Sequence, residues 1–137
     1  MILENPEALR RLLGSARRIA VVGCSPKPER DSHDIAKYLL EVGYEVIPVN
    51  PGQAEILGRK CHPDVVSIPG IVDIVDVFRS PEHMLGVVED AIRAKSRSVW
   101  MQLDTSHPDA VRRADGAGLD VVVEKCIKVA HKVLRIS

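Results

Sequence analysis

Short β-branched apolar runs alternate along this chain with segments of helical period. The five runs are residues 19–22, 46–49, 71–78, 98–103 and 121–124. Their Val and Ile content is typical of parallel strands that are buried on both faces. The main helical segments between them are residues 32–43, 81–92 and 108–117. This alternation predicts βαβ crossovers, and with them a Rossmann-like α/β fold: a doubly wound, mainly parallel five-stranded sheet with helices on both faces.

The remaining segments give weaker signals. Residues 6–16 carry apolar side chains on one helical face, so an amphipathic helix is expected before the first strand. Ser32 is expected to cap the helix that follows that strand. Pro48 has no amide donor, so the strand that contains it is predicted at or near a sheet edge. Residues 57–69 are interpreted as a loop with at most one helical turn, and residues 127–134 as a short closing helix or an extended tail.

Length and composition bound the class of protein. A chain of 137 residues is expected to build one domain over residues 1–137, with the amphipathic segment 1–17 packed on it. The 19 basic and 19 acidic side chains cancel, which argues against nucleic-acid or membrane partners. No signal peptide or membrane span is expected. Three widely spaced cysteines favour reduced thiols in a cytoplasmic protein over a disulfide framework or a metal site.

In open α/β sheets, ligands bind beyond the carboxyl ends of the strands. Here these ends supply a short group of candidates: residues 23–32, residues 50–53, Phe78 with Arg79, Gln102 with Asp104, and Lys125 with Cys126. The function has to be argued from these residues, because the fold itself hosts many activities.

The first strand end departs from a dinucleotide fingerprint. Only Gly23 remains of the three glycines in G-x-G-x-x-G, and the prolines of the turn remove amide donors. Ser25, Lys27 and Arg30, with the amide end of the next helix, are expected to compensate. Asp31 and Asp34 weigh against anion binding there, because carboxylates already favour that helix end. The alternative is a rigid, proline-braced loop with solvated charges.

The second and third strand ends argue against a nicotinamide dinucleotide. An NAD site usually has a carboxylate after its second strand, whereas this chain has Asn50 and Pro51. A neutral side chain tolerates a phosphorylated ribose such as that of coenzyme A, although ordinary turn chemistry also explains the pair. Phe78 and Arg79 are expected either to contact an adenine or a phosphate, or to serve as core and solvated charge. Gln102 has the same ambiguity.

No catalytic constellation emerges from the sequence. The five histidines are scattered and none belongs to a motif. Cys24 has two interpretations: a thiol with a lowered pKa beside a helix N-terminus and two cations, or a small residue packed under the turn. The sequence therefore favours a binding protein over an enzyme.

Several strand-end segments together resemble the stand-alone CoA-binding-domain proteins of bacteria and archaea. The matching segments are residues 19–32, 38–51, 75–79, 99–102 and 121–127. This family is similar to the N-terminal CoA-binding domain of succinyl-CoA synthetase α subunits. The resemblance implies a site for coenzyme A and assigns roles to most of the strand-end residues. It implies that the phosphates are wrapped by Gly23, Cys24, Ser25, Pro26 and Lys27. It matches Arg30 and Ser32 to the family's Arg and Ser after that turn, and it puts Asn50, Pro51 and Gln53 near the adenosine phosphate and Phe78, Arg79 and Gln102 beside the cofactor.

The resemblance implies a non-catalytic carrier, sensor or regulatory module that binds CoA or acyl-CoA, with a protein partner or homodimer as further possibilities. An NAD(P)-binding redox protein, a small enzyme acting on a CoA thioester and a ligand-free scaffold stay open as alternatives. Two positions depart from the family: Asp104 stands where relatives often have glycine, and Ala130 where they tend to have glutamate. The first change is expected to narrow the rim of the site or to repel a phosphate.

Overall fold

A computed structural model describes residues 1–136 of the chain, and Ser137 lies outside the described residues. Its main sheet has five strands in the order β2-β1-β5-β6-β7, and every neighbouring pair runs parallel. The strands are β1 (Arg18–Val22), β2 (Glu45–Val49), β5 (Ile74–Val77), β6 (Ser98–Met101) and β7 (Asp120–Val123). The predicted five-stranded parallel sheet is confirmed, and β2, which contains Pro48, lies at its edge as expected.

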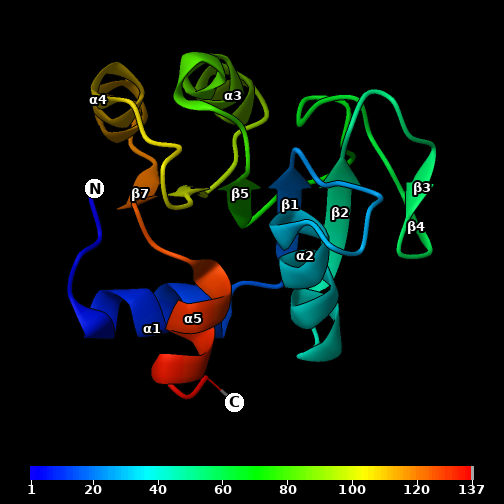
Figure 1. Ribbon diagram of the computed structural model, residues 1–137. Coiled ribbons are helices and arrows are strands. Elements are labelled where there is room, and N and C mark those ends of the chain that lie inside the picture. Colours follow the sequence, from blue (N-terminus) through cyan, green and yellow to red (C-terminus); the bar gives the residue numbers. More distant parts are fainter. Residues whose placement is uncertain (137) are drawn as a thin grey trace.

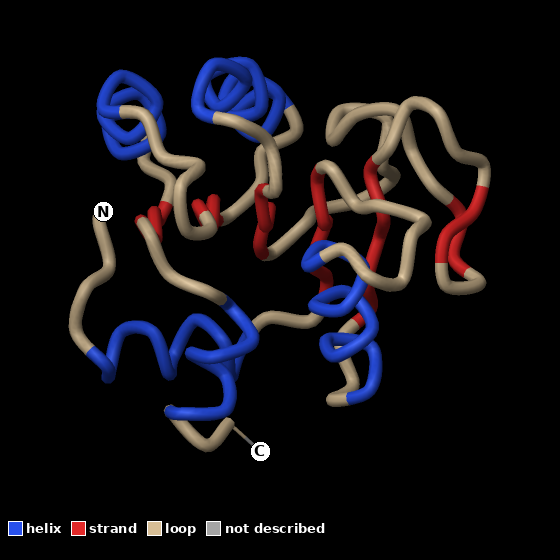
Figure 2. The backbone as a smooth tube through the Cα atoms, in the orientation of Figure 1, coloured by secondary structure: helices blue, strands red, loops and turns tan. Residues whose placement is uncertain are grey.

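Helices cover both faces of this sheet, so the predicted doubly wound arrangement is confirmed. Figure 1 shows α3 (Pro81–Arg93) and α4 (Pro108–Gly116) above the sheet. Below it lie α1 (Pro6–Ser15), α2 (Asp31–Glu41) and α5 (Ile127–Val133). The tube view in Figure 2 separates the same two layers of helices.

Each layer closes a separate apolar core. Met84 and Val88 of α3 pack on one sheet face, and Leu13 of α1 and Leu39 of α2 pack on the other. Complete burial of such side chains stabilises the fold by about 1.5–3 kcal/mol each. The N-terminal segment also joins the sheet, since the Leu3 amide donates to the Val121 carbonyl at 2.8 Å. Among residues 1–136, none of the helices has the length and apolar character needed to span a bilayer.

Three local expectations need correction. The helix after the first strand starts at Asp31, and its cap residue Arg30 makes no side-chain capping bond, so the prediction of Ser32 as the cap is wrong. Strand β5 begins at Ile74 and not at residue 71, because the Asp73 carboxylate accepts the Arg17 and Arg18 amides at the strand entrance.

A small hairpin, β3 (Glu55–Ile56) with β4 (Arg59–Lys60), overlaps the start of the segment 57–69 interpreted as a loop. Its two turn residues, Leu57 and Gly58, both have positive φ, as a tight hairpin turn requires. Two-residue strands are too short to show a period in the sequence. At the C-terminus, the closing helix α5 forms and the extended alternative does not.

Candidate functional site

The carboxyl ends of β1 and β5 meet at a switch point of the sheet. From β1 the chain passes to α2 on one face, and from β5 it passes to α3 on the other, which is where such sheets bind ligands. Gly23 ends β1 with φ +82°, and a Cβ on it would lie 2.8 Å from the Phe78 carbonyl oxygen. Only glycine fits at this close approach of the two strand ends.

The turn after Gly23 is held by its own hydrogen bonds. The Ser25 amide donates to the Ser32 Oγ at 2.9 Å, and the Lys27 amide donates to the Ser25 Oγ at 3.1 Å. His33 Nδ1 donates to the Ser25 carbonyl at 2.9 Å. Ser32 therefore closes the turn from inside α2 and does not cap the helix. The prolines and these bonds give the turn a defined shape before any ligand arrives.

Two cavities follow this turn and the neighbouring strand ends. The first, of about 610 Å³, is lined by Gly23, Ser25, Lys27, Glu29, Arg30, Asp31, Ser32 and Phe78. The second, of about 470 Å³, is lined by Asp31, Asp34, Ile35, Phe78, Arg79, Ser80, Pro81, Gln102, Leu103, Asp104, Thr105, Cys126 and Lys128. Because they share Asp31 and Phe78, they form one depression along the carboxyl ends of the strands, called here the carboxyl-edge groove.

The charge of the groove changes along its length. Lys27 and Arg30 are exposed at the turn end, where Glu29 and Asp31 also line the groove. The first turn of α2 begins there, and its backbone amides favour anions. Toward the other end the carboxylate of Asp34 is 2.8 Å from Lys128 Nζ, and this cation lowers the pKa of the Asp34 carboxyl. One of the acidic charges that weighed against an anion site is therefore already paired.

Asn50 links the first turn to the second strand end. Its Nδ2 donates to the Cys24 carbonyl at 2.9 Å, and its Oδ1 accepts the Gly52 amide at 2.8 Å. Asn50 thus supports the turn from behind. In the part of the chain that the structure describes, Pro51 and Gln53 are exposed and, like Asn50 and Pro26, lie outside the lining of the groove.

Cys24 is packed beneath the turn. Its side chain is fully buried, and this burial, with smaller contributions from Cys61 and Asp76, raises the pKa of the thiol to about 12. The sequence-based alternative of a lowered pKa is wrong, because burial outweighs the cations, which lie in solvent. The Cys24 side chain therefore fills the space beneath the turn, and its thiol is not a reactive thiolate.

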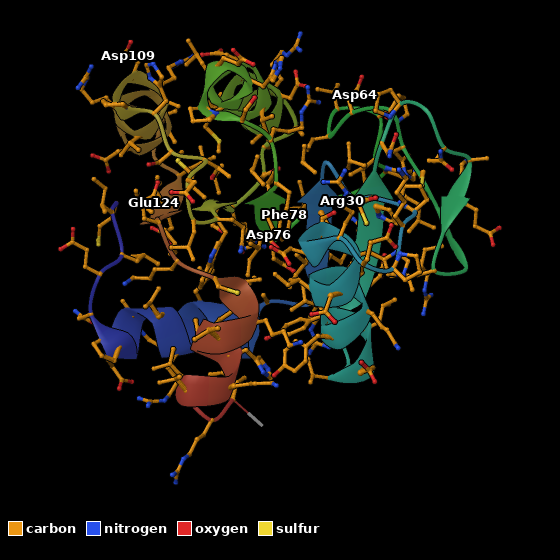
Figure 3. All side chains as sticks on the ribbon, in the orientation of Figure 1. Arg30, Asp64, Asp76, Phe78, Asp109 and Glu124 are labelled. Atoms are coloured by element: carbon orange, nitrogen blue, oxygen red, sulfur yellow. The ribbon has the colours of Figure 1, made fainter. Side chains whose placement is uncertain are left out.

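Asp76 is a feature that sequence reasoning missed. This β5 residue is 0 % exposed, and among the described residues neither of its carboxylate oxygens has a hydrogen-bond partner. Burial raises the pKa of the carboxyl well above its usual range. Figure 3 shows Asp76 next to Phe78, between the sheet and the layer that contains α2 and α5. The available signal was a carboxylate inside an apolar strand pattern.

The fourth strand end closes the groove. Gln102 is buried, and its Oε1 accepts the Ile127 amide at 3.0 Å, which ties β6 to the start of α5. Asp104 has φ +64°, a conformation that glycine adopts without strain. Its amide donates to the Glu124 carboxylate at 2.8 Å, and hydrogen bonds from the Ser106 hydroxyl and the Asp104 amide lower the pKa of that carboxyl.

The groove brings together most of the predicted site residues. On its lining are Gly23, Ser25, Lys27, Arg30, Ser32, Phe78, Arg79 and Gln102. It also includes residues outside the strand-end candidates: Asp34, Ile35, Ser80, Pro81, Leu103, Thr105 and Lys128. Most of these come from helix starts and loops, whose approach to the strand ends is set by tertiary packing.

Comparisons with known proteins agree on one family. A family profile described as "CoA binding domain" matches residues 17–132. An uncharacterised Bacillus subtilis protein, YneT, is 38% identical over 135 residues, which are 97% of this chain and the whole of that protein. A hypothetical protein from Pyrococcus horikoshii OT3 has a solved structure with a TM-score of 0.94 and 44% identity, covering 96% of this chain and 93% of that one.

A longer relative, a ligase, is similar to part of this chain. The ADP-forming acetate–CoA ligase I of Archaeoglobus fulgidus is 41% identical over 75 residues, which are 55% of this chain and 11% of the ligase. The chain therefore spans about a tenth of that enzyme's length. Since the family profile matches most of the chain, and relatives of the same size match almost all of it, the chain belongs to the CoA-binding-domain family.

Proposed function

We propose that this chain binds coenzyme A or an acyl-CoA in the carboxyl-edge groove and acts as a carrier or sensor. The observation that carries the proposal is the convergence of the turn after β1 with Phe78 into one continuous groove. Membership of the CoA-binding-domain family supports the choice of ligand.

The chemistry of the groove follows the order of groups in coenzyme A. Lys27 and Arg30 would hold the phosphates, with Ser25 and the first turn of α2 as hydrogen-bond donors. From there the pantetheine arm would run past Phe78 toward Gln102, where apolar side chains such as Ile35 and Leu103 join the lining. The neutral Asn50 at the second strand end supports CoA over NAD, which usually requires a carboxylate there.

A binding role is supported over a catalytic one by the groups that line the groove. In the described chain no histidine belongs to that lining, and His33 instead donates to the Ser25 carbonyl from a buried position. The Cys24 thiol, with its pKa raised to about 12, is protonated at neutral pH. A nucleophile paired with a base, the usual requirement for attack on a thioester, is not assembled in the described groove.

Isothermal titration calorimetry with CoA, 3′,5′-ADP and NAD tests this proposal. We expect CoA and its nucleotide fragment to bind and NAD to bind far more weakly. Lys27→Ala and Arg30→Ala should each weaken CoA binding about 5- to 150-fold, the range for a lost charge-assisted hydrogen bond of about 1–3 kcal/mol. Lys37→Ala is the matched control, because Lys37 is an exposed lysine of α2 outside the groove lining. Binding of NAD without CoA would refute the proposal.

A further inference from the structure

A third cavity lies between α1 and α5 and is mostly apolar. It has a volume of about 420 Å³, and the side chains that give it this character are Pro6, Leu9, Leu103, Val129, Val133 and Leu134. Three of these are unusually exposed for their type: Leu103 by 57 %, Val129 by 56 % and Val133 by 72 %. Figure 1 shows α1 and α5 side by side below the sheet. This cavity is called here the apolar groove.

The apolar groove continues from the carboxyl-edge groove. Both linings include Leu103 and Cys126, so the two depressions meet where β6 ends and α5 begins. A ligand entering at the turn after β1 would pass Lys27, then Phe78, and then reach this junction. The surface along that path changes from highly polar at the turn end, where Lys27 and Arg30 lie beside Glu29 and Asp31, to mixed and then to apolar.

We propose that the apolar groove holds the acyl chain of a medium-chain fatty acyl-CoA. This inference rests on the proposed CoA site and names the class of its ligand. Phosphates, a polar pantetheine arm and a hydrocarbon tail occur in that order in such a thioester, and the connected grooves offer matching surfaces in the same order. Exposed apolar residues clustered beside a ligand site are a common sign of a ligand's apolar part.

The length of the apolar groove sets the expected chain length. From Cys126 to Val133 there are seven residues of helical rise, about 10 Å at 1.5 Å per residue. An extended saturated chain of about eight carbons has this length, given zigzag C–C bonds of about 1.5 Å. Octanoyl-CoA is therefore the probe of choice.

Calorimetry with CoA, acetyl-CoA and octanoyl-CoA tests the inference. A fully buried methylene contributes about fourfold in affinity, and in an open groove about half of that free energy, or twofold, is expected. The six additional methylenes should make octanoyl-CoA bind roughly 60-fold more tightly than acetyl-CoA. Val129→Asp and Val133→Asp should remove this preference while leaving CoA affinity unchanged. Val66→Asp is the matched control, since Val66 is 45 % exposed and lies outside all three linings.

Distinct outcomes separate this inference from the proposed function. Equal affinities for the three CoA compounds would overturn the inference and leave the proposed function in place. If none of the three binds, the proposed function fails and the inference fails with it. An apolar face can also serve as a contact between two copies of the chain, and sedimentation velocity on the same variants tests this. The inference is overturned if the wild type is a dimer, Val133→Asp dissociates it, and no preference for octanoyl-CoA is measured.

Discussion

The buried carboxyl of Asp76 gives a quantitative test of how the site is built. Above about pH 4 an unfolded chain ionises this group, whereas burial raises its pKa in the folded chain. The folded state therefore holds a proton that the unfolded state releases. The contribution of Asp76 to the free energy of unfolding is greatest below the pKa that the carboxyl has in the unfolded chain. This contribution falls as the pH rises toward the pKa in the folded chain, by at most about 1.4 kcal/mol per pH unit.

Asp76→Val removes this titration together with the burial of an unpaired polar group. Burying a neutral polar group without a partner costs about 1–3 kcal/mol, so the variant should be more stable by that amount near pH 4. Between pH 4 and pH 7 the gain should increase further, by up to about 4 kcal/mol. Val is close to Asp in size and suits a strand, so repacking is a small term.

Urea unfolding at pH 4.5 and pH 7.5, without ligand, measures both effects. Asp76→Asn is the matched control: it keeps a polar group but cannot titrate, so it should remove the pH dependence without the gain at low pH. If Asp76→Val is less stable than the wild type at both pH values, or its gain is the same at both, the carboxyl has a partner and the reasoning is refuted.

Substitutions at three further positions, Gly23, Asn50 and Asp104, test how the groove is supported and charged. Gly23→Ala should destabilise the fold by about 2–3 kcal/mol in urea unfolding, because the new Cβ would clash with the Phe78 carbonyl and the residue has a positive φ. Gly86→Ala is its control: Gly86 is a helical residue with open space around it in the described chain, so this change should be neutral or slightly stabilising. Asn50→Ala should lower stability by about 1–2 kcal/mol through two lost hydrogen bonds, and an unchanged midpoint would contradict this. Asp104→Gly and Asp104→Asn should both tighten CoA binding measured by calorimetry, since each removes a carboxylate from the groove; tightening by glycine alone would assign the effect to backbone strain instead.

Much of the fold was accessible from the sequence because buried parallel strands have a direct signature. The Val and Ile runs placed all five strands of the sheet, and Pro48 placed β2 at the edge. Local signals failed where side chains serve distant partners. Ser32 is a residue type that often caps helices, but here its hydroxyl accepts a hydrogen bond from the Ser25 amide across the turn. The Asp73 carboxylate accepts amides at the entrance of β1, and β5 begins only after it.

The candidate site was accessible only in part, for a related reason. The strand-end rule identified Gly23, Phe78 and Gln102 because carboxyl ends of parallel strands meet at one edge. The contribution of α5, including Lys128 and the apolar groove, depends on how that helix packs against α1 and α2, which no local pattern encodes. The thiol of Cys24 was ambiguous for the same reason, since the burial that raises its pKa depends on tertiary packing.

Mapping CoA onto the folded chain by amide chemical shifts tests the central claim most directly. In a ¹⁵N-labelled sample titrated with CoA, the largest shifts should fall on the non-proline residues of 23–32, on Phe78 and Arg79, and on residues 102–105. These amides line or adjoin the carboxyl-edge groove. Shifts at the opposite, amino end of the sheet, around residues 13–17 and 42–45, or no shifts at all with excess CoA, would contradict the account.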